Sequence, residues 1–156
     1  MNDLYLNIYN NLIKLTRNKN LYNTNKQDIF YDRMIIFFFH LAFLLKTYKN
    51  IEPKNKLQSF FDYCIRQIEL SIREIGYVDA TINKKMKEYV NMFYAILDKI
   101  EVTDMSIDEN ITNFFRKIFN LDKNIKFYAN YYKKYNEYLS NNTLNNFTKD
   151  IINHNF

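Results

Sequence analysis

The residue types that most often carry catalysis or bind metals are scarce in this chain of 156 residues. Its only histidines are His40 and His154, and its only cysteine is Cys64. The chain has no glycine-rich phosphate loop, HExxH helix, CxxC pair or nucleophile elbow. A metal site needs several ligands at matched spacing, and neither histidine has a second ligand nearby. We therefore predict no enzymatic activity, no metal and no cofactor. His40 is expected to be a hydrogen-bonded core residue and Cys64 an inert buried thiol.

Charged side chains gather instead around the only glycine of the chain, Gly76. The cluster consists of Arg73, Glu74, Asp79, Lys84, Lys85 and Lys87. Lysines in the first turns of a helix oppose its macrodipole, so these lysines do not serve helix stability. Exposed charge is nevertheless the default for a helix surface. Two interpretations stay open, a solvated turn and a binding surface for a charged partner.

Two helices are expected to position these charges, one on each side of Gly76. Residues 57–75 and 82–100 both place apolar side chains every three or four positions. Asp62, Arg66, Glu69 and Arg73 form a ladder of opposite charges along the first of these helices. Asp79 is predicted to cap the second helix, and Gly76 is predicted to end the first in a left-handed conformation. Because the turn is short, we expect a tight antiparallel hairpin.

A central helix is expected at residues 29–46, the most apolar window of the chain. Phe30, Met34 and Phe37 begin one apolar stripe, while Ile36 and Phe39 belong to a second face. A helix that is apolar nearly all round is buried on several sides. Asp28 is predicted to cap its beginning.

The alternative for this window is a membrane span. Only His40 interrupts the apolar run at residues 34–45, but Arg33 and Lys46 lie just outside its two ends. Crossing the hydrocarbon takes about 20 apolar residues. The run also begins too far into the chain for a signal peptide, and no cleavage site of small residues follows it. The sequence therefore predicts a buried helix and no transmembrane segment.

Shorter helices are expected before and after this group. Residues 4–15 and 107–119 each carry an amphipathic helical pattern. Residues 121–139 carry Phe127 and five tyrosines at helical spacing, and we expect their hydroxyls to reach solvent at the edge of the core. For residues 141–156 two interpretations stay open, a short terminal helix and a flexible tail.

Composition sets the fold class. Glycine and proline occur once each, which is too few for the turns of a sheet protein. We predict an all-α fold, a compact single-domain helical bundle of about six helices around the buried central helix, over residues 1–156. The single cysteine, Cys64, allows no internal disulfide, and it indicates a reducing, cytosol-like compartment.

The net charge of +5 makes the surface mildly basic. Such a charge suits RNA, anionic lipid or a negatively charged assembly, and it selects none of them. In an RNA-binding protein, tyrosine rings would stack on bases and lysines would contact phosphates. Against this alternative, the tyrosines lie at helix-packing spacing and no RNA-binding module pattern occurs.

The residues on both sides of Gly76 resemble the ubiquinol-cytochrome c chaperone family. The family pattern falls on Phe61 and Asp62, on Ile72 to Gly76, on Asp79, on Ile82, Lys84, Met86 and Lys87, and on Phe93 and Tyr94. Asp32 and Arg33, with the run through His40, resemble the arginine-aromatic segment and histidine-containing helix of the family. The family-like core covers residues 28–100. Within it, Val78 stands where the family has a glycine, and Ala95 and Ile96 replace a glycine-arginine pair.

The resemblance implies a non-enzymatic, all-α chaperone for the assembly of ubiquinol-cytochrome c reductase, respiratory complex III. The implied partner is newly made cytochrome b or a complex III assembly intermediate, with the ribosome as a further candidate. The implied location is the cytoplasm or the mitochondrial matrix, peripheral to the inner membrane. The partner-binding residues that it implies are Asp62, Arg73, Glu74, Asp79, Lys84 and Lys87. A groove between aromatic helices for an apolar client segment is a second expectation. The alternative is a basic RNA- or ribosome-binding helical protein without a respiratory client.

Overall fold

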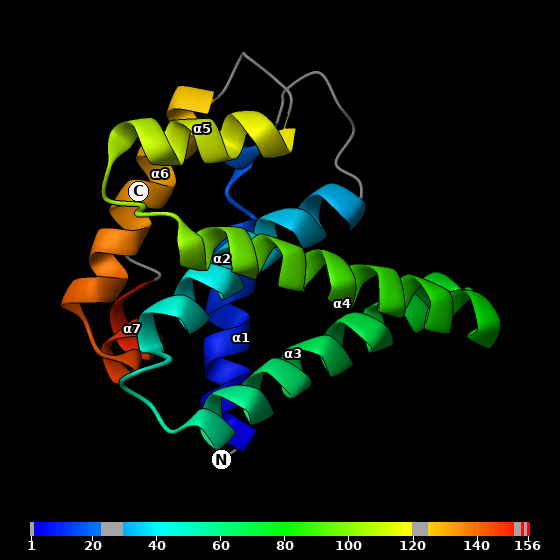
Figure 1. The fold of residues 1–156 in the computed structure, drawn as a ribbon. Coiled ribbons are helices and arrows are strands. Elements are labelled where there is room, and N and C mark those ends of the chain that lie inside the picture. Colours follow the sequence, from blue (N-terminus) through cyan, green and yellow to red (C-terminus); the bar gives the residue numbers. More distant parts are fainter. Residues whose placement is uncertain (1, 23–29, 120–124, 152–153, 155) are drawn as a thin grey trace.

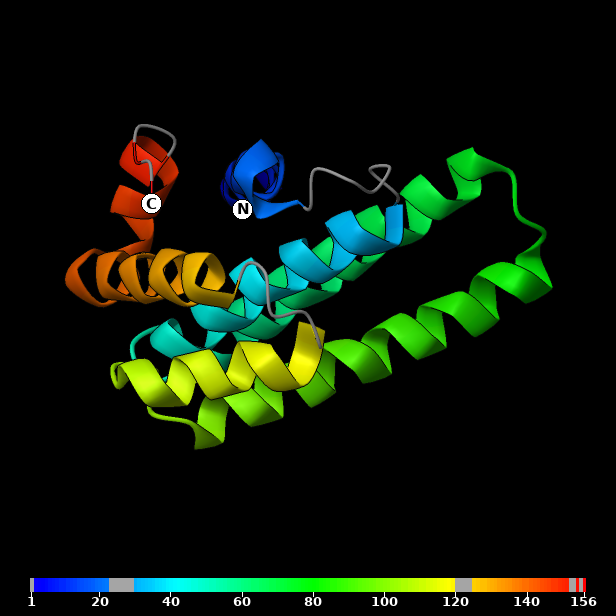
Figure 2. The same ribbon diagram turned by 90° about the horizontal axis from the view of Figure 1, so that it is seen from above.

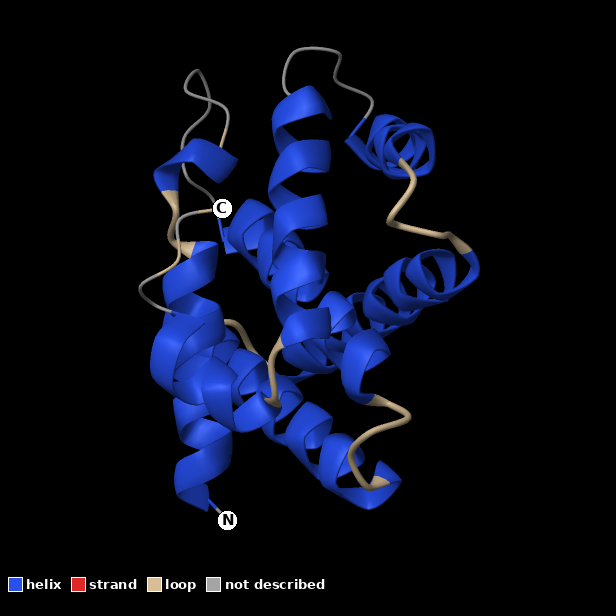
Figure 3. Cartoon of the chain, turned by 90° about the vertical axis from the view of Figure 1, so that its left-hand side faces the viewer, coloured by secondary structure: helices blue, strands red, loops and turns tan. Residues whose placement is uncertain are grey.

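The described part of the chain contains seven α-helices and a short 3₁₀ helix, η1 (Lys19–Leu21), and no strand occurs in it. The structure is a computed structural model that describes residues 2–22, 30–119, 125–151, 154 and 156 (Figure 1). The helices are α1 (Asn2–Thr16), α2 (Phe30–Tyr48), α3 (Lys54–Ile75), α4 (Asp79–Val102), α5 (Asp108–Phe119), α6 (Ile125–Asn141) and α7 (Leu144–Asp150). Figure 3, coloured by secondary structure, shows only helices and loops among the described residues. The predicted all-α class is confirmed.

Helix α2 lies at the centre of the fold, as the sequence predicts. Every side chain from Ile36 to Leu44 is buried, and α1, α4 and α6 all pack against this helix (Figure 1). Burial of one large apolar side chain is worth about 1.5–3 kcal/mol, so α2 contributes a large share of the core energy. No helix in the described ranges has an apolar stretch long enough to cross a bilayer. The predicted cap, Asp28, lies outside the described residues.

A cluster of aromatic rings joins α2 to α5 and α6. The ring of Phe39 lies 5.5 Å from that of Phe115 and 5.6 Å from that of Tyr132. Phe43 stacks on the opposite side of the cluster, with its ring 5.4 Å from Tyr132 and nearly parallel to it. Such pairs add about 0.5–1.5 kcal/mol beyond the area that they bury. The C-terminal helices are therefore part of the main core.

The expectation that the tyrosines of α6 reach solvent is wrong. Tyr131, Tyr132 and Tyr135 are buried. The Tyr135 hydroxyl donates to the His40 carbonyl at 2.9 Å, and the Tyr131 hydroxyl lies 2.8 Å from His40 Nε2. The Tyr132 hydroxyl has no hydrogen-bond partner among the described residues. Acceptors on α2 thus satisfy two hydroxyls inside the core, which is why these rings do not need the edge.

His40 is the polar centre of this core, and its role as a hydrogen-bonded core residue is confirmed. Its Nδ1 lies 2.8 Å from the Ile36 carbonyl. Because a carbonyl only accepts, the proton is on Nδ1, and Nε2 accepts from the Tyr131 hydroxyl. Burial lowers the His40 pKa from 6.5 to about 4. Cys64 is also buried, and burial raises the pKa of its thiol.

Of the two interpretations for residues 141–156, the structure shows the short terminal helix, α7. The Thr143 hydroxyl accepts from the Asn146 backbone N–H at 3.2 Å and caps the helix. Phe147 is buried, and the side chain of Asn11 donates to its carbonyl at 3.2 Å. These contacts attach α7 to α1, at the opposite end of the sequence.

The neutral His40 makes stability depend on pH. The unfolded chain binds a proton near pH 6.5, whereas the folded chain binds it only near pH 4. The stabilisation is therefore complete above pH 6.5, and about 3 kcal/mol of it is lost as the pH falls from 6.5 to 4. We expect urea unfolding to show this loss in the wild type. His40→Gln, which cannot titrate, should show a shallower slope, and equal slopes would contradict the assignment.

Candidate binding surface on the α3–α4 hairpin

The turn between α3 and α4 depends on Gly76. This residue has φ of 100° and ends α3 with its N–H donating to the Arg73 carbonyl at 3.0 Å. The predicted left-handed C-cap is confirmed. The predicted cap of α4 is wrong, because Val78 takes that position and no side chain caps the helix. Asp79 is the first residue of α4, and its carboxylate is turned to Arg73 instead.

A ladder of ion pairs runs along α3 and crosses the turn. Arg73 lies 3.1 Å from the Glu69 carboxylate and 2.6 Å from the Asp79 carboxylate. Glu69 also pairs with Arg66 at 2.6 Å, and hydrogen bonds from both guanidinium groups lower the Glu69 pKa. Arg73 and Asp79 therefore form an exposed ion pair across the turn, and their charges largely satisfy each other.

Lys84 and Lys87 are predicted cations that take no part in this ladder. They are exposed and lie three residues apart on α4, on the face opposite Ile82 and Phe93. Within the described part of the chain, neither lysine has a carboxylate partner, and neither does Glu74 on α3. The Lys85 ammonium lies over the Tyr77 ring, 4.8 Å from its centre. Three of the predicted charges thus remain available to a partner.

Exposed apolar side chains at the turn are a feature that the sequence analysis missed. Ile75 is 53% exposed, Tyr77 44% and Val78 69%. Ile75 belongs to the apolar stripe of α3, but the last turn of this helix extends beyond the helices that would cover it (Figure 2). A usable signal was the pair Tyr77 and Val78, two large apolar residues in a turn of three. An apolar tip (Ile75, Tyr77 and Val78) therefore adjoins the charged cluster.

Asp62 lies apart from the turn. It precedes Gly76 by 14 residues, a rise of about 21 Å along a helix, and it accepts a hydrogen bond from Gln58. Its neighbour Phe61 lies 5.0 Å from Phe93 and 5.7 Å from Tyr94, measured between ring centres. The two ends of the family pattern therefore meet across the hairpin. The structure brings the other five predicted residues to the turn and places Asp62 beside this aromatic contact.

The hairpin is antiparallel but not tight over its whole length. Helices α3 and α4 meet at the turn and diverge away from it (Figures 1 and 2). Phe38 of α2 packs against Phe93 of α4, with ring centres 5.3 Å apart. The central helix thus packs against the α4 arm. The predicted antiparallel hairpin is present, and its arms pack closely at the turn and at the Phe61–Phe93 contact.

The profile of the ubiquinol-cytochrome c chaperone family matches residues 23–119. The chain belongs to this family. The match spans α2 to α5 and includes all six predicted partner-binding residues, and it extends on both sides beyond the core of residues 28–100. Searches of curated proteins and of solved structures returned no significant match.

Two other kinds of site find little support in the structure of this family member. Among the described residues, no three His, Cys, Asp or Glu side chains are grouped so as to hold a metal ion. The five tyrosines of α6, which could have stacked on bases, are buried, while Tyr31, Tyr77 and Tyr94 are exposed. The hairpin is therefore the strongest candidate surface.

The positive φ of Gly76 gives a prediction for stability. A Cβ at this position would meet no atom within 4 Å, so Gly76→Ala changes only the backbone energy. We expect a loss of about 1–2 kcal/mol of unfolding free energy, measured by urea denaturation. Gly76→Asn is the control, because asparagine tolerates the left-handed region better and should lose less. Equal losses in the two variants would contradict an origin in φ.

Proposed function

We propose that this protein is a non-enzymatic assembly chaperone for ubiquinol-cytochrome c reductase, respiratory complex III, and that it binds newly made cytochrome b. Membership in the ubiquinol-cytochrome c chaperone family is the observation that carries the proposal. The contact surface in this proposal is the hairpin, which lies wholly inside the matched segment.

The chemistry of the hairpin suits a protein partner. An apolar centre with a charged rim is the usual composition of a protein interface. Ile75, Tyr77 and Val78 supply such a centre, and Lys84 and Lys87 supply cations beside it. In this arrangement the apolar tip covers an apolar part of the client, while the lysines contact carboxylates on the client.

The remaining predicted residues receive narrower roles in this proposal. Arg73 and Asp79 are positioning residues, because they pair with each other and fix the turn. Glu74 and Asp62 are exposed acceptors for donors on the client. The same lysines suit the phosphates of a ribosome. Binding to the ribosome would bring the protein to its client as cytochrome b is made. The place of this contact would be the cytoplasmic or matrix face of the inner membrane.

The test is whether the exposed lysines are needed for cytochrome b. We expect cells that lack the protein to lose the cytochrome b signal in the dithionite-reduced difference spectrum of their membranes. The wild-type gene should restore the signal, and a Lys84→Glu/Lys87→Glu variant should restore less than about a tenth of it, since two reversed charges weaken the contact by at least tenfold.

The matched control is Lys117→Glu/Lys134→Glu. These two exposed lysines lie on α5 and α6, and the double change alters the net charge by the same amount. This control should restore cytochrome b fully. If the null cells keep normal cytochrome b, the proposed client is wrong. If both double variants restore it equally, the client stands and the hairpin surface is wrong.

A further inference from the structure

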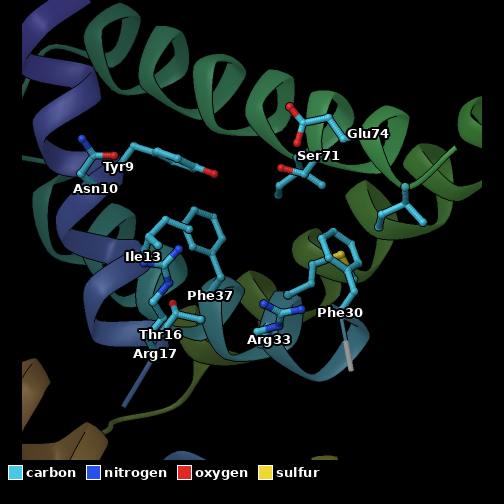
Figure 4. Close-up of a pocket in the computed structure, with 13 residues that line it drawn as sticks. Tyr9, Asn10, Ile13, Thr16, Arg17, Phe30, Arg33, Phe37, Ser71 and Glu74 are labelled. Carbon is cyan, nitrogen blue, oxygen red and sulfur yellow. The ribbon is translucent and has the colours of Figure 1, made fainter. Parts of the chain in front are cut away.

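A cleft of about 500 Å³ lies between α1, α2 and α3 (Figure 4). Its apolar part comes from all three helices, and it includes Ile13, Met34, Phe37 and Ile68. The cleft shares Glu74 and Ile75 with the hairpin surface, but no described residue of α4 lines it, so Lys84 and Lys87 lie outside it. Volumes of 300–1,000 Å³ are typical of ligand sites.

Opposite charges lie on facing walls of this cleft. Arg17 follows the end of α1, and Glu74 is on α3, across the apolar part from it (Figure 4). Neither has an ion-pair partner among the described residues. Arg33 of α2 lines the same side as Arg17. The cleft therefore has a cationic side and an anionic side.

Tyr9 adds a hydrogen-bond donor on the α1 wall. Its ring is held by Phe37 and Tyr63, with ring centres 5.7 Å and 6.0 Å away. Its hydroxyl has no hydrogen-bond partner in the part of the chain that the structure describes, and it points into the cleft (Figure 4). Burial raises the Tyr9 pKa to about 12, so the hydroxyl keeps its proton at neutral pH. It can donate to a carbonyl or carboxylate of an occupant.

We propose that this cleft binds an amphipathic peptide segment, with an acidic side chain at Arg17, a basic side chain at Glu74 and apolar side chains between them. A peptide supplies both charges together with backbone carbonyls for Tyr9. An acyl chain offers at most an anionic head, which Arg17 would attract, and leaves Glu74 without a partner. The inference rests on the proposed function, because the segment would belong to the client.

The geometry fits the known mode in which a short helix lies in an apolar groove. In that mode, residues at i, i+3, i+4 and i+7 anchor one face, and flanking charges set the direction. The apolar lining residues Phe30, Ile13 and Ile75 are half-buried or exposed, so a bound segment would remove their apolar area from water. The two unpaired charges would then fix which end of the segment meets α1.

The experiment uses the full chain and a phage-displayed library of random short peptides. Peptides are selected on the wild type after removal of those that bind Ser71→Trp, in which a bulky ring from α3 fills the cleft. We expect peptides that carry an acid and a base separated by apolar residues. By fluorescence anisotropy, Arg17→Glu and Glu74→Lys should each weaken binding about tenfold. Lys14→Glu, an exposed change on the same helix, is the matched control and should bind normally.

A charge exchange makes the test specific. A selected peptide whose acidic residue is replaced by lysine should bind Arg17→Glu better than it binds the wild type. The proposal is overturned if Arg17→Glu and Glu74→Lys leave the binding of the selected peptides unchanged, or if laurate alone binds the cleft and no peptide is enriched. Arg17→Glu and Glu74→Lys replace exposed side chains, so they remain informative even if Ser71→Trp fails to fold. The cytochrome b spectrum tests the proposed function separately, because its lysine variants leave the cleft unchanged.

Discussion

A helix without a polar face controls this fold. Since Ile36 to Leu44 are all buried, α2 has no side that can face water, and other helices must cover it in every direction. Helices α1, α4 and α6 meet that need, and α5 joins them through Phe114 and Phe115. The one polar side chain in the buried run, His40, has both ring nitrogens hydrogen-bonded inside the core. The core therefore tolerates this polar group at little cost.

The candidate surface lies at the turn between α3 and α4, beyond the part of the hairpin that packs against α2. Helices α3 and α4 extend past the part of α2 that they enclose, and their last and first turns have no neighbour on the outside (Figure 2). Ile75, Tyr77 and Val78 are exposed there, and the Arg73–Asp79 ion pair gives the turn a fixed geometry. The hairpin thus combines an ion pair across its turn with exposed apolar surface.

Sequence reasoning succeeded where one residue type or one period decides the structure. The apolar window predicted α2, and Gly76 predicted the C-cap because only glycine adopts positive φ freely. It failed where two uses of one group compete, as for Asp79, whose carboxylate pairs with Arg73 and leaves the helix uncapped. It also failed for the tyrosines of α6, because their acceptors lie on α2 and are brought near only by folding. The cleft was invisible for the same reason, since its walls come from three separate helices.

The hydrogen bond between Tyr131 and His40 has a consequence for how the family should be delimited. The match to the family profile ends with α5, yet the donor to His40 and the ring that stacks on Phe43 both come from α6. Cut at the end of the match, the chain would lose the cover on this side of α2, and its apolar side chains would meet water. The matched segment and the packed core are thus two different lengths of polypeptide.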